Sequence, residues 1–249
     1  MRIDSTKIVS FSGIDGAGKS TQIEALERYL HELGFRCTLC TFWDNVVAFP
    51  RVREFISHRA FRGDKGVGSP ESPINRRDKN VQSWYATTAR LLFYFLDTLS
   101  LRMTLAGMAG NGCHFIIVDR YIYDELANLP LQHKLMRLYV RALLKLSPKP
   151  NVAYLVDADP EAARLRKPEY PLDFLRRNRD AYIALSQMIG EMKIIGPSSV
   201  EEANAQVLEA IGECLRSECE LTELNQRAGN MNIPVQGGAQ NHRVRHPAS

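Results

Sequence analysis

The feature that most constrains the fold lies near the start of the chain, where residues 13–20 match the pattern G-x-x-x-x-G-K-[ST]. Residues 7–11 before it are mostly apolar and predict a short strand. Residues 22–33 after it predict an amphipathic helix, with Ile23, Leu26, Leu30 and Leu33 on one face. A strand, this loop and a helix in that order form the context in which the pattern binds phosphate.

The residues of the loop have distinct expected roles. Glycines allow the backbone N–H groups to point inward toward phosphate oxygens, and the following helix adds the positive end of its dipole. We expect Lys19 to reach the terminal phosphates and the Ser20 hydroxyl to ligate Mg²⁺. The expected phosphate-binding residues are Gly13, Gly16, Ala17, Gly18, Lys19, Ser20 and Thr21.

The composition indicates a globular protein with a small phosphorylated ligand. Of the 249 residues, 45% are hydrophobic and 24% are charged, which is enough for a sizeable core. The net charge of +4 suits a phosphorylated ligand, and without a basic, aromatic-interleaved repeat we expect no nucleic-acid partner. Five cysteines, an odd number, favour a reducing compartment. Cys37 and Cys40 form a single C-x-x-C, either a metal or redox pair or two buried small side chains.

Two segments bear on location. Residues 1–7 lack the apolar core of a secretory signal. The most apolar run, residues 91–105, is interrupted by Asp97 and Arg102 and is expected to be too short to span a bilayer. We therefore expect a cytoplasmic protein without a membrane span.

Apolar strands alternate with helices through residue 217, which predicts an α/β fold with a doubly wound parallel sheet. A polar segment at 61–79 predicts a long loop, and few large apolar residues at 218–249 predict a disordered tail. One structured domain is thus expected over 1–217. Strands are expected at 7–11, 36–42, 114–118, 152–157 and 192–195, and helices at 22–33, 46–60, 80–108, 131–146, 160–167, 172–190 and 199–217.

Asp119 and Arg120 stand where the third expected strand ends. Ligands of such sheets bind at the carboxyl ends of the strands, so Asp119 is expected beside Ser20 and its Mg²⁺. The alternative for Asp119 is a carboxylate that caps the next turn. Arg120 could bind a phosphate through two hydrogen bonds, or form a surface ion pair.

A second cluster follows the fourth expected strand. Asp159, Pro160 and Glu161 are typical of a helix start. Basic residues that follow could stabilise the charge that develops during phosphoryl transfer, as a closing lid does, or could simply be solvated. They are Arg164, Arg166, Lys167, Arg176, Arg177 and Arg179.

Together these motifs resemble thymidylate kinase. The similarity rests on F-x-G-x-D-G-x-G-K-S-T-Q at 11–22, D-R-Y at 119–121, D-x-D-P-E at 157–161, and Phe174, Arg179 and Tyr182, and it covers residues 7–217 in order. It implies a P-loop NTPase fold with a five-stranded parallel sheet, helices on both faces and a short lid. It also implies transfer of the γ-phosphate of Mg²⁺·ATP to a nucleoside monophosphate, by default dTMP, and often a homodimer.

The resemblance assigns roles to residues of this chain. Asp15 would lie at the acceptor sugar or phosphate, and Lys19 and Ser20 at ATP and Mg²⁺. Arg120 would bind the acceptor phosphate, and Arg166 would act from the lid. The expected catalytic residues are therefore Lys19, Asp15, Arg120 and Arg166, and the expected metal residues are Ser20 and Asp119.

The acceptor side departs from the family pattern. Where the family has an arginine and a proline after the second strand, this chain has Thr41-Phe42-Trp43-Asp44-Asn45. The long helix of the family has an arginine four residues after a phenylalanine. Here Phe93 or Tyr94 could supply the ring, and the fourth residue on is then Asp97 or Thr98. After D-R-Y the family tends to show serines, and this chain has Ile122-Tyr123-Asp124-Glu125. The residues available to replace the missing arginine are Arg51, Arg53, Arg76, Arg77 and Arg90.

These departures leave two other functions open. The chain could be a kinase for a nucleoside or a non-nucleotide acceptor, with Asp15 and Asp44 positioning the attacking group. It could also be a nucleotide-binding regulatory protein without catalysis.

Overall fold

The computed structural model describes the backbone of residues 5–47 and 84–231 and the side chains of residues 5–47 and 88–217. The chain divides into two compact units, Met1–Cys214 and Leu215–Ser249. Most of the helix predicted at 46–60, and all of the loop predicted at 61–79, lie outside the described residues.

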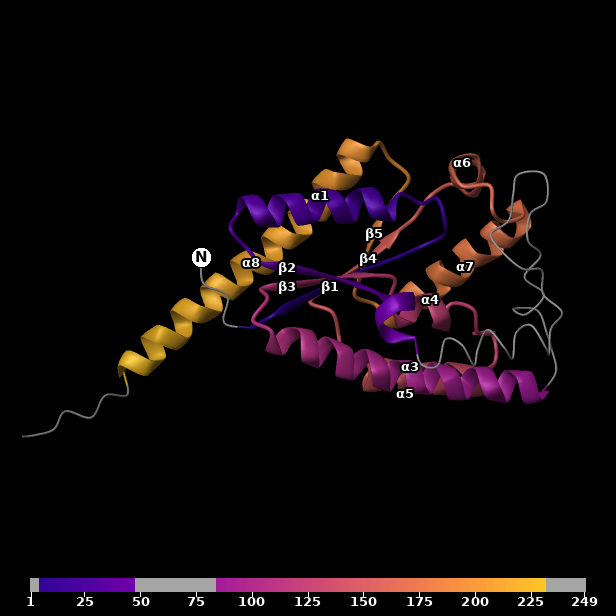
Figure 1. Ribbon diagram of the computed structural model, residues 1–249, viewed down its shortest axis with the longest axis horizontal. Helices are drawn as coiled ribbons and strands as arrows, with labels where there is room; N and C mark the ends of the chain where they lie inside the picture. The colour runs from indigo at the N-terminus through magenta and orange to yellow at the C-terminus, as the bar shows by residue number, and fades with distance from the viewer. Residues whose placement is uncertain (1–4, 48–83, 232–249) are drawn as a thin grey trace, which may run out of the picture. The chain divides into compact units, whose positions relative to one another are not determined.

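The first unit is built on a parallel five-stranded sheet with the order β2-β3-β1-β4-β5 (Figure 1). This confirms the predicted α/β fold class, and each predicted strand is present with its ends shifted by at most one residue. Burial on both faces explains the apolar sequence of β4, in which all five residues are buried. The strands are β1 (Lys7–Ser12), β2 (Cys37–Thr41), β3 (Phe115–Asp119), β4 (Val152–Val156) and β5 (Met192–Ile195).

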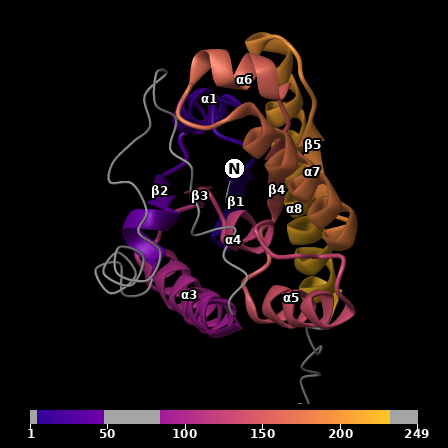
Figure 2. The ribbon, with the colours of Figure 1, turned by 90° about the vertical axis from the view of Figure 1, so that its right-hand side faces the viewer.

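Helices cover both faces of the sheet. Figure 1 shows α1 on one side of the sheet and α3 and α5 on the other. Figure 2 faces the carboxyl ends of the strands, with α4, α6 and α7 around them. The helices are α1 (Lys19–Glu32), the π-helix η1 (Phe42–Val46), α3 (Trp84–Gly110), α4 (Ile122–Leu126), α5 (Lys134–Leu146), α6 (Pro160–Arg166), α7 (Leu172–Ile189) and α8 (Val200–Met231).

The phosphate loop is held between β4 and α6. Gly13 has φ +141°, and a Cβ there would collide with the Val156 carbonyl oxygen. Gly16 has φ +81°, and a Cβ there would collide with the Ala163 carbonyl oxygen in α6. Only glycine combines a left-handed backbone with so close an approach of another main chain. The start of α6 is as predicted, because the Asp159 carboxylate accepts a hydrogen bond from the Ala162 N–H at 3.0 Å.

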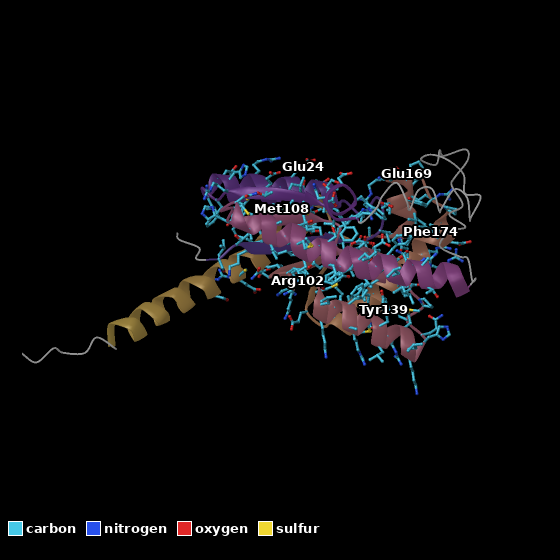
Figure 3. All side chains as sticks on the ribbon, turned by 60° about the horizontal axis from the view of Figure 1, so that its bottom comes forward. Glu24, Arg102, Met108, Tyr139, Glu169 and Phe174 are labelled. Atoms are coloured by element: carbon cyan, nitrogen blue, oxygen red, sulfur yellow. The ribbon has the colours of Figure 1, made fainter. Side chains whose placement is uncertain are left out.

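The long helix α3 is paired with α5. Arg102 of α3 donates to the Leu146 carbonyl at 3.3 Å, and the Tyr139 hydroxyl of α5 donates to the Leu91 carbonyl (Figure 3). Within α3, residues Thr88–Gly110 are by length and composition apolar enough to cross a membrane, and this stretch is longer than the apolar run 91–105. The core helix of a soluble protein passes the same test, and α3 packs against β3, α4 and α5.

The C-terminal helix is longer than predicted. Instead of ending at 217, α8 continues to Met231. Glu occurs three times and Leu twice in residues 218–231, and both are strong helix formers even where they cannot build a core. Residues 232–249 lie outside the described residues.

Cys37 and Cys40 pack as small apolar side chains of β2. Cys37 is partly buried and Cys40 is buried in β2, and burial raises the pKa of each thiol to about 11. Strand residues three apart point to opposite faces of a sheet, so the two thiols do not face each other. Among the described residues, no three His, Cys, Asp or Glu side chains are grouped to hold a metal ion.

Candidate active site

Lys19 is the cation at the centre of the phosphate loop. It is the first residue of α1 and only 7% exposed, and its Nζ donates to the carbonyl oxygens of Gly13 at 2.8 Å and Ile14 at 2.9 Å. Burial, the largest cause, lowers the pKa of Lys19 to about 8, and the Arg120 charge acts in the same direction. The negative charge of a bound phosphate would favour the protonated form of Lys19.

Arg120, whose charge acts on Lys19, has an unusual backbone conformation. It directly follows β3 with φ +65°, the only left-handed non-glycine residue among those described, and its N–H donates to the Phe11 carbonyl at 3.0 Å. Non-glycine residues held in this region are concentrated at functional sites. Its Nη2 forms an ion pair with Asp15 of the phosphate loop. The two predicted catalytic residues therefore meet, although 105 positions separate them in the sequence.

The charges of this pair stabilise each other. Burial acts to raise the pKa of Asp15, but the charges of Arg120, Lys19 and Lys167 together lower it. Burial acts to lower the pKa of Arg120, but the charges of Asp124 and Asp15 raise it above its ordinary value. Both groups are therefore ionised at neutral pH.

Asp124, which the sequence analysis did not single out for a role, is the most connected side chain of the site. It lies in α4 and is 6% exposed. Its Oδ2 accepts hydrogen bonds from Ser12 Oγ at 2.6 Å and from the Tyr121 N–H at 3.0 Å. Its Oδ1 accepts from Tyr182 Oη of α7 at 2.7 Å and from Arg120 Nη1 at 3.5 Å. One signal in the sequence was available, because this carboxylate stands where the family tends to have serines.

Asp119 and Ser20 have the donor chemistry that a hydrated Mg²⁺ requires. Asp119 ends β3, and its charge acts to raise the pKa of Lys19, which places the carboxylate near the loop. Ser20 is exposed in the first turn of α1. Mg²⁺ in such sites keeps several waters and takes one or two protein ligands beside substrate phosphates. Two oxygen ligands without a larger acidic cluster among the described residues fit that coordination.

The predicted lid residues lie on α6 and α7. Arg179 pairs with Asp157 through two hydrogen bonds, at 2.6 and 2.7 Å, and Arg176 pairs with Glu161. Arg166, expected to be catalytic, is exposed and donates from Nε to the Ala162 carbonyl at 3.3 Å. The structure therefore joins Lys19, Asp15 and Arg120 but leaves Arg166 outside their contacts.

The acceptor side shows how the departures from the family pattern are built. The segment after β2 forms the π-helix η1, in which the Asn45 side chain accepts from the Thr41 N–H at 2.8 Å. In α3, Asp97 and Thr98 are fully buried. Of the proposed replacement arginines, Arg51, Arg53, Arg76 and Arg77 lie outside the described residues, and Arg90 lies within α3.

Comparisons with known proteins agree on one family. The chain is 27% identical over 216 residues to a probable thymidylate kinase of Pyrobaculum aerophilum, covering 84% of this chain and 97% of that protein. A probable thymidylate kinase of Thermococcus kodakarensis is 25% identical over 224 residues, covering 84% of this chain and 99% of that protein. No family model matches the chain.

Two solved structures of thymidylate kinases share the fold of this chain. The thymidylate kinase of Ehrlichia chaffeensis matches with a TM-score of 0.54 and 16% identity, covering 84% of this chain and 99% of that one. The thymidylate kinase of Candida albicans matches with a TM-score of 0.56 and 20% identity, covering 84% of this chain and 92% of that one.

Proposed function

Because the chain belongs to the thymidylate kinase family, we propose that it transfers the γ-phosphate of ATP to a nucleoside monophosphate, with dTMP as the acceptor. The observation that carries this proposal is the Asp15–Arg120 ion pair, which joins the phosphate loop to the end of β3. A protein that only binds ATP needs the loop and Lys19. It does not need an arginine at the end of β3 whose backbone is held in the left-handed conformation.

On the donor side, Lys19 would exchange its two loop carbonyl partners for the terminal phosphates of ATP. Mg²⁺ would be held by Ser20, with Asp119 close by, and when bound it neutralises charge on the phosphate oxygens. The N–H groups from Gly13 to Thr21 would bind the remaining oxygens. These groups are fixed by the fold, so they stabilise developing charge without having to reorganise.

On the acceptor side, Arg120 would bind the acceptor phosphate, and Asp15 would contact the acceptor sugar or phosphate. The guanidinium is planar and always charged, so it suits phosphate recognition through two hydrogen bonds. Arg166 would turn inward when the lid closes and would stabilise charge that develops in transfer. Its exposed position and its single backbone hydrogen bond leave it free to make that turn.

The proposal extends to the organisation of the protein. The kinase domain would span residues 1–217, which the division of the chain after Cys214 supports. The enzyme would work in the cytoplasm, as a homodimer packed through its helices. It would act on small nucleotides and not on nucleic acid.

The test is acceptor-dependent formation of ADP by the full chain with Mg²⁺·ATP. The panel contains dTMP and other nucleoside monophosphates, thymidine and other nucleosides, and sugar phosphates. We expect dTMP to be the best acceptor and Lys19→Ala to abolish the signal. A clear preference for a nucleoside or a sugar phosphate would assign the chain to that acceptor instead. ATP binding by calorimetry without turnover on any acceptor would contradict the proposal.

A further inference from the structure

Asp124 connects three parts of the site through one carboxylate. Its donors come from the last residue of β1, from the turn after β3 and from α7. Ser12, on β1, is the residue directly before the phosphate loop, and Tyr182, on α7, belongs to the helix that carries Arg176 and Arg179. An ionised carboxylate can accept about four hydrogen bonds, and in this site the four places are all taken.

Arg120 is held by a different acid at each of its terminal nitrogens. Nη2 is paired with Asp15 and Nη1 with Asp124. The two acids differ in surroundings, because the Asp15 side chain is 18% exposed in the loop whereas that of Asp124 is 5% exposed. Asp124 also keeps three further donors. The Arg120–Asp124 contact is the longer of the two, at 3.5 Å, but these donors fix Asp124 in place, so we expect a ligand to displace Asp15 from Arg120 first.

We propose that Asp124 is a positioning residue of the reaction, which orients Arg120 toward the acceptor phosphate and links this arginine to α7 through Tyr182. The proposal rests on the proposed function, because the acceptor phosphate defines the position that Arg120 must hold. When the acceptor binds, its phosphate takes the Nη2 side of Arg120 from Asp15, while Asp124 retains the Nη1 side. Asp124 is also one of the departures from the family pattern, which tends to have serines here.

The test begins with Asp124→Asn, which keeps the size of the side chain and removes its charge. We expect KM for the acceptor to rise about tenfold or more, since a charge-assisted partner of Arg120 is lost, while KM for ATP stays within about twofold. The matched control is Glu125→Gln, the neighbouring acid of α4, which is also 6% exposed. We expect this variant to keep KM for the acceptor within about twofold of the wild type.

A double-mutant cycle separates positioning from a merely structural role. If Asp124 acts through Arg120, Asp124→Asn adds less than about a twofold effect in the Arg120→Ala background. An equal effect in both backgrounds would overturn the proposal. If Asp124→Asn does not fold, Tyr182→Phe removes one donor to the same carboxylate and is expected to raise KM for the acceptor by a few-fold. No change in this second variant would equally overturn it.

A readout without turnover keeps this inference apart from the proposed function. In ¹⁵N-labelled full chain, the Arg120 guanidinium protons should exchange slowly with water and be assigned by their loss in Arg120→Ala. We expect exchange to become at least tenfold faster in Asp124→Asn and to stay unchanged in Glu125→Gln. Unchanged exchange in Asp124→Asn would overturn the positioning role even in an active enzyme. A wild type inactive on every monophosphate would overturn the proposed function and, with it, the acceptor role of Arg120.

Discussion

The cations around the phosphate loop fall into two groups that the fold holds in different ways. Lys19 and Arg120 lie at the carboxyl ends of central strands, and Lys19 is 7% exposed. Arg166, Arg176 and Arg179 lie on α6 and α7, and the Arg176 side chain is 53% exposed. The first group is bound by loop carbonyls and by Asp15 and Asp124, and the Arg120 side chain is 23% exposed, whereas acids or a carbonyl near the surface bind the second.

The two groups of cations have different roles in such a site. Buried cations are in place before a ligand arrives, and preorganised charge of this kind contributes most to catalysis. Exposed arginines can exchange an acid for water at little cost, which a lid that opens and closes requires. Substitutions should therefore have large effects in the buried group and smaller ones on the lid.

The largest effect is expected from Lys19→Ala. The variant removes the only described cation bound to the loop carbonyls of Gly13 and Ile14, so charge on the transferred phosphate loses its fixed partner. We expect kcat to fall by about a thousandfold or more. Steady-state ADP formation measures this loss. A fall no larger than that of a lid variant would break the distinction between the two groups.

Arg120→Ala should come next. The guanidinium is proposed to bind the acceptor, so we expect kcat/KM for the acceptor to fall by about 10²–10³-fold, with KM for ATP changing far less. Arg120→Lys keeps the charge but loses the planar pair of donors, and should recover only a small part of the activity. Full recovery with lysine would show that charge alone is required here.

Arg166→Ala tests the lid. Removing an arginine that reaches the phosphates only on closure should lower kcat and leave both KM values near those of the wild type. We expect kcat to fall by about 10–100-fold. Arg177→Ala, which changes another exposed arginine on α7, is the matched control and should retain wild-type kcat. Equal rates for the two variants would remove Arg166 from the catalytic residues.

The buried group should also show a pH effect that the lid does not. Burial lowers the pKa of Lys19 from 10.5 to about 8, so the amine is partly neutral near that pH. Bound phosphates favour the charged form and raise this pKa, so ATP binding near pH 8 takes up protons and weakens as the pH rises further. Calorimetry in two buffers of different ionisation enthalpy measures the uptake. Lys19→Met should abolish it.

The same shift predicts how stability depends on pH. The native state releases the Lys19 proton near pH 8, whereas the unfolded chain holds it up to about 10.5. The unfolded state therefore binds more protons in this window, and the free energy of unfolding contributed by Lys19 rises with pH across it. Denaturant unfolding of wild type and Lys19→Met measures the difference. A contribution that falls with pH would contradict the shift.

The smallest effect is expected from Arg176→Ala. Its ion pair with Glu161 joins α7 to α6, but both side chains are about half exposed. Exposed pairs of this kind contribute little to stability because solvent screens their charges, so thermal unfolding should change little. A clear loss of thermal stability in Arg176→Ala would contradict this expectation and show that the pair holds the two lid helices together.

The sequence was informative where one local pattern decides the structure. The strand, loop and helix around Gly13–Ser20, the apolar strands and the start of α6 at Asp159 all follow from short-range rules. The helices η1 and α4 were missed because each has five residues, too few to show a helical period.

The site was predictable only in part for the same reason. Asp15, Lys19 and Arg120 follow from motifs, and the structure brings them together. The role of Asp124 depends on Ser12 and Tyr182, which reach it from 112 and 58 positions away. No local pattern encodes contacts of that range. From the sequence, Asp124 could be recognised only as a departure from the family pattern.

The contact between Gly16 and Ala163 also limits how this sequence can vary over evolution. A side chain at position 16 would need the α6 backbone to move, and a shift of α6 would open a gap above the loop. Because the contact is made by the main chain of residue 163, glycine is required at position 16 whatever side chain residue 163 carries. We expect insertions among natural variants of the lid to fall after Ala163, where no such contact ties the chain to the loop.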